Sequence, residues 1–242
     1  LHLSLRRQRQ MCIRDSRWFD AYIERVLSKD AAELYGLQFP DRLNNLLNKL
    51  AAQGTAELVA AHIGRALDIP QRSVPTYLAA LSDVFLLNQL PSWGTNLEKR
   101  AISKPKVFLS DTALATSLAG LDPEALEMNI SSTITGGICE AFVANELLKQ
   151  KAWSSIDYRL FHFRTSTGKE VDLVLESRSR DIVGVEVKAA MSIQPKDFAG
   201  LRYLQQVAGA SFRAGIVLYT GKDVLPMGKN LWAMPISTLW HG

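Results

Sequence analysis

The sequence predicts an α+β protein in which a helical unit precedes a domain with a mixed sheet flanked by helices. In the first part of the chain, apolar residues such as Leu43, Leu46 and Leu50 recur at helical spacing. After residue 137, helical patterns and strand-like runs follow one another in the order helix, strand, hairpin, helix, strand, which is typical of a mixed sheet. With 242 residues, 47% of them hydrophobic, the chain is long enough to bury a core.

Residues 1–16 show no hydrophobic period that connects them to the helices after them. The segment 6–16 reads RRQRQMCIRDS and resembles one translation frame of a DNA adapter used in transposon-based sequencing libraries. We therefore interpret 1–16 as a non-native, adapter-derived tail, with a native basic tail as the alternative. This tail contributes +3 of the formal net charge of +4. The basic charge of the chain is therefore no evidence for nucleic-acid binding.

Residues 17–121 are expected to form a helical domain that ends in a winged helix. A helix is expected to open at Gly54-Thr55 and to end near Pro70, and another is expected to be capped by Ser73. Two strands follow. The predicted elements are two helices within 17–52, helices over about 54–69 and 73–84, strands over 84–90 and 106–110, and a short helix over 111–121. Helix, short turn, helix and two strands resemble a winged helix with its wing between the strands.

A DNA-binding winged helix places the second helix of the pair in the major groove. Polar and basic residues stand at the start of that helix and near the wing. The main candidates for DNA contact are Arg72, Ser73, Thr76, Lys99 and Arg100, with Gln71, Lys104 and Lys106 beside them. The alternative is a module for protein interaction or interdomain packing, because the face of this helix is only weakly basic.

A polar connector that ends in Gly136-Gly137 is expected to mark the boundary to a second domain, residues 122–242. The predicted elements of this domain are a helix over 138–150, a strand over 158–164, a hairpin of 171–176 with 182–189, a helix over 195–207 and a strand over 212–219.

The hairpin of the second domain brings charged residues to one face. Period-two alternation puts Asp172 and Val174 on the same face of the first strand, and Glu186 and Lys188 on the matching face of the second. With a turn at 177–181, Asp172 lies opposite Glu186, and Glu170 lies opposite Lys188. Like charges placed opposite each other destabilise a sheet.

A divalent cation offsets the repulsion between Asp172 and Glu186, because carboxylate oxygens suit Mg²⁺ or Mn²⁺. Lys188 on the same face can orient a water or stabilise charge on a phosphoryl oxygen. Glu140 is expected to join from the preceding helix, where a carboxylate among small and apolar neighbours is costly unless it is paired or metal-bound. The alternatives are a first-turn glutamate favoured by the helix dipole and, for the strand residues, a solvent-exposed salt bridge.

The sequence contains a set of residues similar to the PD-(D/E)xK nuclease pattern: Glu140, then Val171-Asp172, then Glu186-Val187-Lys188. The resemblance implies that Asp172 and Glu186 bind the metal with help from the Val187 carbonyl, that Lys188 positions the attacking water, and that Glu140 completes the acidic set. The usual proline before the aspartate is Val171 here. The implied fold is a restriction-endonuclease-like mixed sheet.

Five stretches, in order, extend the resemblance over residues 17–240: Ser73-Val74-Pro75-Thr76-Tyr77-Leu78, Pro105-Lys106-Val107-Phe108-Leu109-Ser110-Asp111, Gly168-Lys169-Glu170-Val171-Asp172, Val185-Glu186-Val187-Lys188 and Val217-Leu218-Tyr219-Thr220-Gly221. Together they resemble the C-terminal portion of prokaryotic AAA-type ATP-binding proteins, in which a winged helix precedes a nuclease-like domain of unknown function. No GxxxxGK[ST] loop occurs in the sequence, so we expect no ATP site in this chain. An ATPase domain is implied for the full-length protein.

These patterns predict a Mg²⁺- or Mn²⁺-dependent nuclease that acts on DNA in the cytoplasm, with a homo-oligomer or the ATPase domain as further partners. The alternative is a catalytically silent module of the same fold that binds nucleic acid or a protein. No membrane segment is expected, because no run reaches about 18 apolar residues.

Other candidates for chemistry have weaker support in the sequence. Cys12 and Cys139 lack metal-ligand spacing, and a buried thiol is the simplest interpretation of Cys139. His162 and His241 together with carboxylates are an alternative metal site, but without a recognisable spacing.

Overall fold

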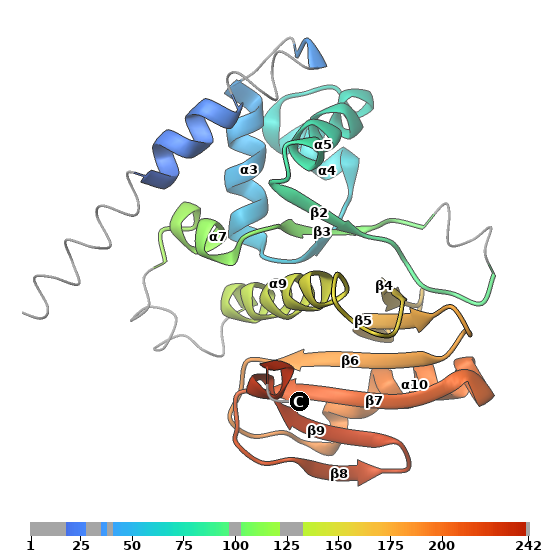
Figure 1. The fold of residues 1–242 in the computed structure, drawn as a ribbon. Coiled ribbons are helices and arrows are strands. Elements are labelled where there is room, and N and C mark those ends of the chain that lie inside the picture. Colours follow the sequence, from blue (N-terminus) through green and yellow to red (C-terminus); the bar gives the residue numbers. More distant parts are fainter. Residues whose placement is uncertain (1–17, 28–34, 38–40, 97–102, 122–132, 241–242) are drawn as a thin grey trace, which may run out of the picture. The chain divides into compact units, whose positions relative to one another are not determined.

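The structure of the chain is a computed structural model (Figure 1) that describes residues 18–27, 35–37, 41–96, 103–121 and 133–240. The chain divides into two compact units. The first consists of Leu1–Ala52, Val59–Asn88 and Leu109–Asp122, and the second of Gln53–Leu58, Gln89–Phe108 and Pro123–Gly242. Two short segments that the sequence places in the first domain, 53–58 and 89–108, therefore group with the second unit. The domain boundaries predicted from the sequence stay a prediction.

The first unit is mainly helical. Its apolar stripe of Leu43, Leu46 and Leu50 is buried, as the helical period predicts. Ser73 precedes a helix as expected, but its side chain makes no capping hydrogen bond. Residues 18–27 are helical, and the further elements are α3 (Asp41–Gln53), α4 (Ala60–Leu67), the 3-10 helix η2 (Gln71–Ser73), α5 (Val74–Asp83) and α7 (Thr112–Leu118).

The segment after Gly54 does not open a helix, which corrects the sequence prediction. Ala56–Glu57 form the short strand β1, and α4 begins only at Ala60. β1 pairs antiparallel with β3 (Lys106–Leu109), which lies between β1 and β2 (Leu87–Leu90) in a small sheet. Gly54 has φ +68°, a left-handed conformation that favours glycine after the end of a helix.

The second unit contains a six-stranded mixed sheet, which confirms the predicted fold class (Figure 1). Its strands are β4 (Tyr158–Arg164), β5 (Glu170–Ser177), β6 (Ile182–Lys188), β7 (Phe212–Tyr219), β8 (Leu225–Gly228) and β9 (Leu231–Pro235), in the spatial order β4-β5-β6-β7-β9-β8. The pairs β6-β7 and β7-β9 are parallel, and the others are antiparallel. β8 and β9 have no counterpart in the sequence prediction.

Helices cover both faces of this sheet. Ala144 and Leu147 of α9 (Thr133–Gln150) pack in one core with the buried side chain of Leu173. Leu201 of α10 (Ala199–Ala208) packs in another core with Ile182. The remaining elements are the 3-10 helices η3 (Pro195–Phe198), η4 (Gly209–Ser211) and η5 (Ile236–Trp240). None of the described helices has the length and apolar character needed to cross a bilayer.

Gly136 and Gly137 lie inside α9, which begins at Thr133 and not at Ile138 as the sequence predicts. A Cβ on Gly137 would lie 2.9 Å from the carbonyl oxygen of Gln53, and a Cβ on Gly54 would lie 2.6 Å from the carbonyl carbon of Gly137. The glycine therefore permits a close approach of two backbones. The rest of the expected connector, 122–132, lies outside the described residues.

Gly200 lies where α10 approaches β5 closely, and Gly200→Ala is expected to destabilise the protein. A Cβ there would lie 1.8 Å from the carbonyl oxygen of Glu170, so the backbone must shift. Overpacking of this kind costs about 1–3 kcal/mol, and we expect the upper end. The measurement is chemical denaturation. Gly136→Ala is the control, because a Cβ there meets nothing within 4 Å; equal losses in the two variants would contradict the prediction.

Candidate functional site

A cluster of charged side chains lies within the second unit and contains the site residues predicted from the sequence. Asp172 lies on β5, Glu186 and Lys188 on β6, and Glu140 on α9. The cluster also contains Lys106, at the first position of β3. Salt bridges connect Lys106 to Glu140 and Asp172, and Lys188 to Glu186.

The side chain of Asp172 is hydrogen-bonded to the backbone of the neighbouring strand β6. Its side chain is 12% exposed, and Oδ2 accepts a hydrogen bond of 2.9 Å from the backbone N–H of Val187. The predicted register of β5 and β6 is confirmed where the two strands pair, and the ladder ends at Leu173 opposite Val185. Asp172 and Glu186 follow directly beyond this last pair.

The prediction that Asp172 shares a face with Val174 is wrong. The pairing of β4 with β5 shifts by one residue between Phe161 and Phe163, and Val171 and Val174 consequently both pack in the core with α10. Asp172 Oδ1 instead lies 3.5 Å from Lys106 Nζ, which also binds Glu140 of α9, the helix over the other face. A bulge of this kind re-aims a side chain and breaks period-two alternation.

Both carboxylate oxygens of Glu140 are occupied. Oε1 accepts a 2.8 Å hydrogen bond from Lys106 Nζ, and Oε2 accepts one of 2.6 Å from Thr55 Oγ1. Burial and then the charge of Asp172 raise the pKa of Glu140 to about 7, against the opposing effects of Lys106 and Thr55. The alternative of a first-turn glutamate is wrong, because α9 begins at Thr133.

Glu186 has one engaged and one unengaged oxygen. Oε1 accepts a 2.8 Å hydrogen bond from Lys188 Nζ, whereas Oε2 is buried and has no hydrogen-bond partner among the described residues. Burial and then the charge of Asp172 raise the pKa of Glu186 to about 8. With 14% of its side chain exposed, Glu186 does not form the solvent-exposed salt bridge considered as the alternative.

Lys188 is half-buried beside this carboxylate. Burial acts to lower its pKa, but Glu186 and Asp172 more than offset that effect, so the pKa lies above its ordinary value. The ammonium group of Lys188 therefore stays charged next to Glu186. An ammonium in this position can orient a water or stabilise a developing negative charge.

Lys106 is the site residue that sequence reasoning missed. It was considered as a contact to DNA near the wing, but its side chain is only 5% exposed and lies among Glu140, Glu170 and Asp172. Burial acts to lower the pKa of Lys106, and these carboxylates raise it above its usual range. The sequence feature that points to a buried, paired Lys106 is its position as the only charged residue of β3, whose other residues are apolar.

Glu170 also departs from its expected partner. Its Oε1 lies 2.7 Å from Lys106 Nζ and its Oε2 3.7 Å from Arg164, whereas the sequence placed it opposite Lys188. Burial acts to raise the pKa of Glu170, but Lys106 and Arg164 lower it below its usual value. Glu170 is therefore held ionised by two cations.

Within the described residues, no three acidic, histidine or cysteine side chains converge closely enough to hold a metal ion. The ammonium of Lys106 lies among three of the carboxylates and already supplies a positive charge there. The predicted Mg²⁺ or Mn²⁺ ligands Asp172, Glu186 and Val187 therefore stay a prediction. The unengaged Oε2 of Glu186 is the observation that fits a cation.

The candidate DNA contacts lie on α5 and just before it, in the first unit. Arg72 and Thr76 are exposed, and Ser73 is half-buried. Lys99 and Arg100 lie outside the described residues. DNA contact by this region stays a prediction.

Cysteine and histidine chemistry gains no support. Burial, then the charges of Asp172 and Glu140, raise the pKa of the Cys139 thiol to about 11, so the thiol stays protonated. Burial also lowers the pKa of His162, whose Nε2 lies 3.0 Å from the carbonyl oxygen of Lys104. His241, the other proposed histidine ligand, and Cys12 lie outside the described residues.

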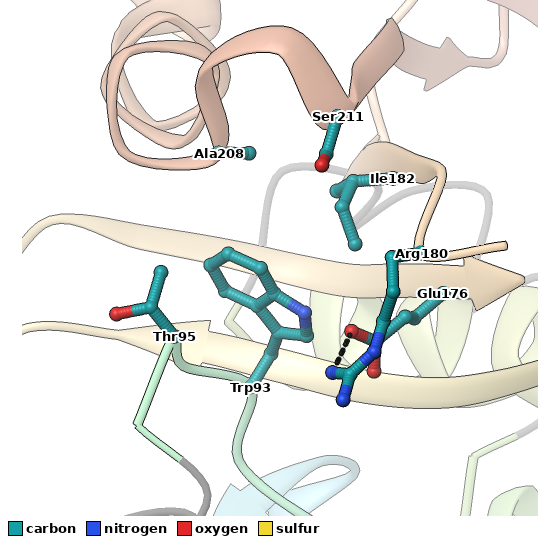
Figure 2. Close-up of a pocket in the computed structure, with 7 residues that line it drawn as sticks. All are labelled: Trp93, Thr95, Glu176, Arg180, Ile182, Ala208 and Ser211. Carbon is teal, nitrogen blue, oxygen red and sulfur yellow. Dashed lines mark hydrogen bonds and ion pairs between the residues drawn. The ribbon is translucent and has the colours of Figure 1, made fainter. Parts of the chain in front are cut away.

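A separate pocket of about 300 Å³ lies elsewhere in the second unit and contains none of the predicted site residues. Figure 2 shows the indole of Trp93 in this pocket beside the ion pair of Arg180 with Glu176, whose atoms are 3.1 Å apart. The pocket is lined by Trp93, Thr95, Glu176, Arg180, Ile182, Ala208 and Ser211.

Comparison with known proteins adds two families. Residues 135–239 match the "Domain of unknown function (DUF4143)" and residues 6–125 match the "Domain of unknown function (DUF8612)". The second match begins inside the segment that we attribute to an adapter, and that attribution stays a prediction.

Two mycobacterial proteins are similar to most of the chain. They are "Uncharacterized protein Mb2031c" of Mycobacterium bovis and "Uncharacterized protein Rv2008c" of Mycobacterium tuberculosis, each 31% identical over 222 residues. The match covers 90% of this chain, which spans only 47% of each relative. Among solved structures, "Structure of Disulfide formed AbfR" is 19% identical to this chain. The match covers 62% of this chain and 96% of the AbfR chain, with a TM-score of 0.23. The members of the charged cluster on β5, β6 and α9 lie within the stretch, residues 135–239, that is similar to the DUF4143 domain.

Proposed function

We propose that this chain is a divalent-metal-dependent nuclease that hydrolyses phosphodiester bonds in DNA. The observation that carries the proposal is the buried Oε2 of Glu186, which lacks a hydrogen-bond partner among the described residues and is influenced by the charge of Asp172. A buried carboxylate oxygen without a partner is costly, and a divalent cation relieves that cost.

The surrounding residues fit the chemistry of such a site. Asp172 and Glu186, with the backbone carbonyl of Val187, would hold the ion, and Lys188 lies 2.8 Å from Glu186. When bound, Mg²⁺ neutralises charge on the phosphate and lowers the pKa of a coordinated water. Lys188, which stays protonated, then stabilises negative charge on the phosphoryl group or orients the attacking water. The similarity to the PD-(D/E)xK pattern implies the same roles for Asp172, Glu186 and Lys188.

The first unit supports DNA as the substrate. The order α4, η2, α5, β2 and β3, in which most of β3 groups with the second unit, resembles that of a winged helix, and Arg72 and Thr76 are exposed at the start of its second helix. We propose that this unit binds DNA. Its weak net charge predicts modest affinity with a shallow salt dependence.

An ATPase domain is proposed as the regulator of the nuclease in the full-length protein. The resembling family combines an AAA-type domain with this pair of domains. The matched region fills 47% of each mycobacterial relative, a proportion that leaves room for such a domain.

A catalytically silent binding module is the second candidate, and Lys106 favours it. Because this lysine already neutralises Glu140, Glu170 and Asp172, the cluster has an internal counter-ion without any metal. Such a module would bind DNA or a protein partner through the same fold.

Cleavage of DNA by the full chain separates these two candidates. With Mg²⁺ present, the wild-type chain is expected to cleave, and Asp172→Asn is expected to lower the rate by roughly 100-fold or more through loss of a metal ligand. Asp157→Asn is the control, because Asp157 is an exposed aspartate paired with Arg178. Equal rates in both variants, or cleavage in EDTA, would contradict the proposal. DNA binding without cleavage would support the silent module.

A further inference from the structure

Lys106 reaches the charged cluster from a part of the sequence outside the DUF4143 match. It begins β3 and belongs with Thr55 to the two N-terminal segments that group with the second unit. Its Nζ lies 2.7 Å from Glu170 Oε1, 2.8 Å from Glu140 Oε1 and 3.5 Å from Asp172 Oδ1. The cluster is therefore incomplete within residues 135–239 alone.

A buried ammonium needs this set of partners. Removing a lysine from water is costly, and only closely placed anions offset that cost. Conversely, without Lys106 the carboxylates of Glu140, Glu170 and Asp172 would repel one another. The lysine and the three acids therefore stabilise each other as one unit.

The contacts divide the acids into two groups. Glu140 is fully engaged, by Lys106 on one oxygen and Thr55 on the other. Glu186 retains an oxygen without a partner among the described residues. Asp172 lies between the two groups, because its Oδ1 lies 3.5 Å from Lys106 Nζ and its Oδ2 accepts a 2.9 Å hydrogen bond from the backbone N–H of Val187, the residue after Glu186.

In sites with two metal ions, the ions lie about 3.5–4 Å apart and share a bridging carboxylate. Asp172 is the candidate for such a carboxylate here, with Lys106 at Oδ1 and the backbone of β6 next to Glu186 at Oδ2. We propose that Lys106 is a built-in cation that occupies the position of a second divalent ion, so that the site binds one metal ion, held by Asp172 and Glu186. Glu140 is then a positioning residue for Lys106 and not a metal ligand. This inference rests on the proposed metal-dependent function.

The test is the number of Mn²⁺ ions bound by the full chain, measured by calorimetry and by the electron paramagnetic resonance of free Mn²⁺. The wild-type chain is expected to bind one ion. Lys106→Met is expected to bind two, and to gain more thermal stability from Mn²⁺ than the wild type does, because the second ion replaces the lost ammonium. Lys104→Met is the matched control: Lys104 is exposed and two residues away, and its variant should bind one ion.

Glu140→Gln keeps the test decisive if Lys106→Met does not fold. Glutamine preserves the shape of the side chain and its contact with Thr55. Because Glu140 only positions Lys106, this variant should still bind one ion, with an affinity lowered by about 10- to 100-fold, the effect of losing a partner of a ligand. Glu186→Gln, which removes a ligand, should abolish binding.

The outcomes separate this inference from the proposed function. Two ions in the wild type, one in a folded Lys106→Met, or none in Glu140→Gln would each overturn the role of Lys106 and leave the metal-dependent function standing. A wild-type chain that binds no Mn²⁺ would overturn the proposed function and this inference together. Loss of DNA cleavage with one ion bound would affect only the proposed function.

Discussion

Glu186→Gln is expected to make the metal-free protein more stable while it removes the response to Mg²⁺. In the wild type, burial and the nearby charge of Asp172 oppose the ionised form of Glu186, and its Oε2 lacks a partner among the described residues. A neutral amide relieves this cost. The expected gain in the free energy of unfolding is about 1–3 kcal/mol, the cost of an unsatisfied buried group. A gain in stability with a loss of function is typical of a functional site.

The effect of Glu186→Gln has a defined pH dependence. The pKa of Glu186 is raised to about 8, compared with roughly 4.3 in an unfolded chain. Between these values the folded state holds more protons than the unfolded state, so the free energy of unfolding falls as the pH rises from about 4 to 8. Glu140, with a pKa of about 7, contributes in the same direction. The fall should be shallower in Glu186→Gln.

Thermal unfolding in EDTA at several pH values measures this prediction, because each kcal/mol shifts the midpoint by about 2–4 °C for a chain of this size. Glu176→Gln is the matched control. Glu176 is also buried on a strand of the same sheet, but its carboxylate is paired with Arg180 at 3.1 Å, so this variant should lose stability. A wild type that is more stable than Glu186→Gln at pH 8 would contradict the prediction.

Lys188→Met is expected to lower the rate of DNA cleavage by about 100- to 1000-fold while Mn²⁺ binding persists. The physical reason is that Lys188 is a donor next to the reacting group and not a ligand. Its Nζ lies 2.8 Å from Glu186 Oε1, and its side chain is about one-third exposed, within reach of a substrate.

Single-turnover rates with saturating Mg²⁺, together with Mn²⁺ titration, separate the two effects of Lys188→Met. Lys196→Met is the control, because Lys196 is exposed on η3, next to Asp197, whose charge acts on Lys188. If Lys188→Met cleaved at the wild-type rate, Lys188 would have no part in the reaction. If it failed to bind Mn²⁺, its role would lie in holding Glu186.

The sequence alone determined the elements whose patterns are local. Strands 158–164 and 212–219 have the bounds expected from the sequence, because alternation and β-branched residues mark each strand within its own few residues. The hairpin register, with Glu176 opposite Ile182, follows from the length of its turn. These local signals were sufficient to bring Asp172 and Glu186 to the ends of adjacent strands.

Other elements depended on contacts that no local pattern contains. β8 and β9 are short strands, and they complete the sheet through β7. Gly137 lies in a helix at a point where the backbone of Gln53 leaves no room for a Cβ, whereas the sequence shows only two glycines in a row. From sequence alone, a pair of glycines predicts a flexible connector, because the residues that pack against it are not known.

Only the tertiary structure decided how the charges of the site are balanced. The bulge near Phe163 turns Asp172 away from the face of Val174, and β3 brings Lys106 to it from 66 positions earlier in the chain. Electrostatic partners depend on distance in space, and burial strengthens them by excluding water. The sequence therefore determined which acidic residues lie at the ends of adjacent strands, and the fold determined that a lysine lies among Glu140, Glu170 and Asp172.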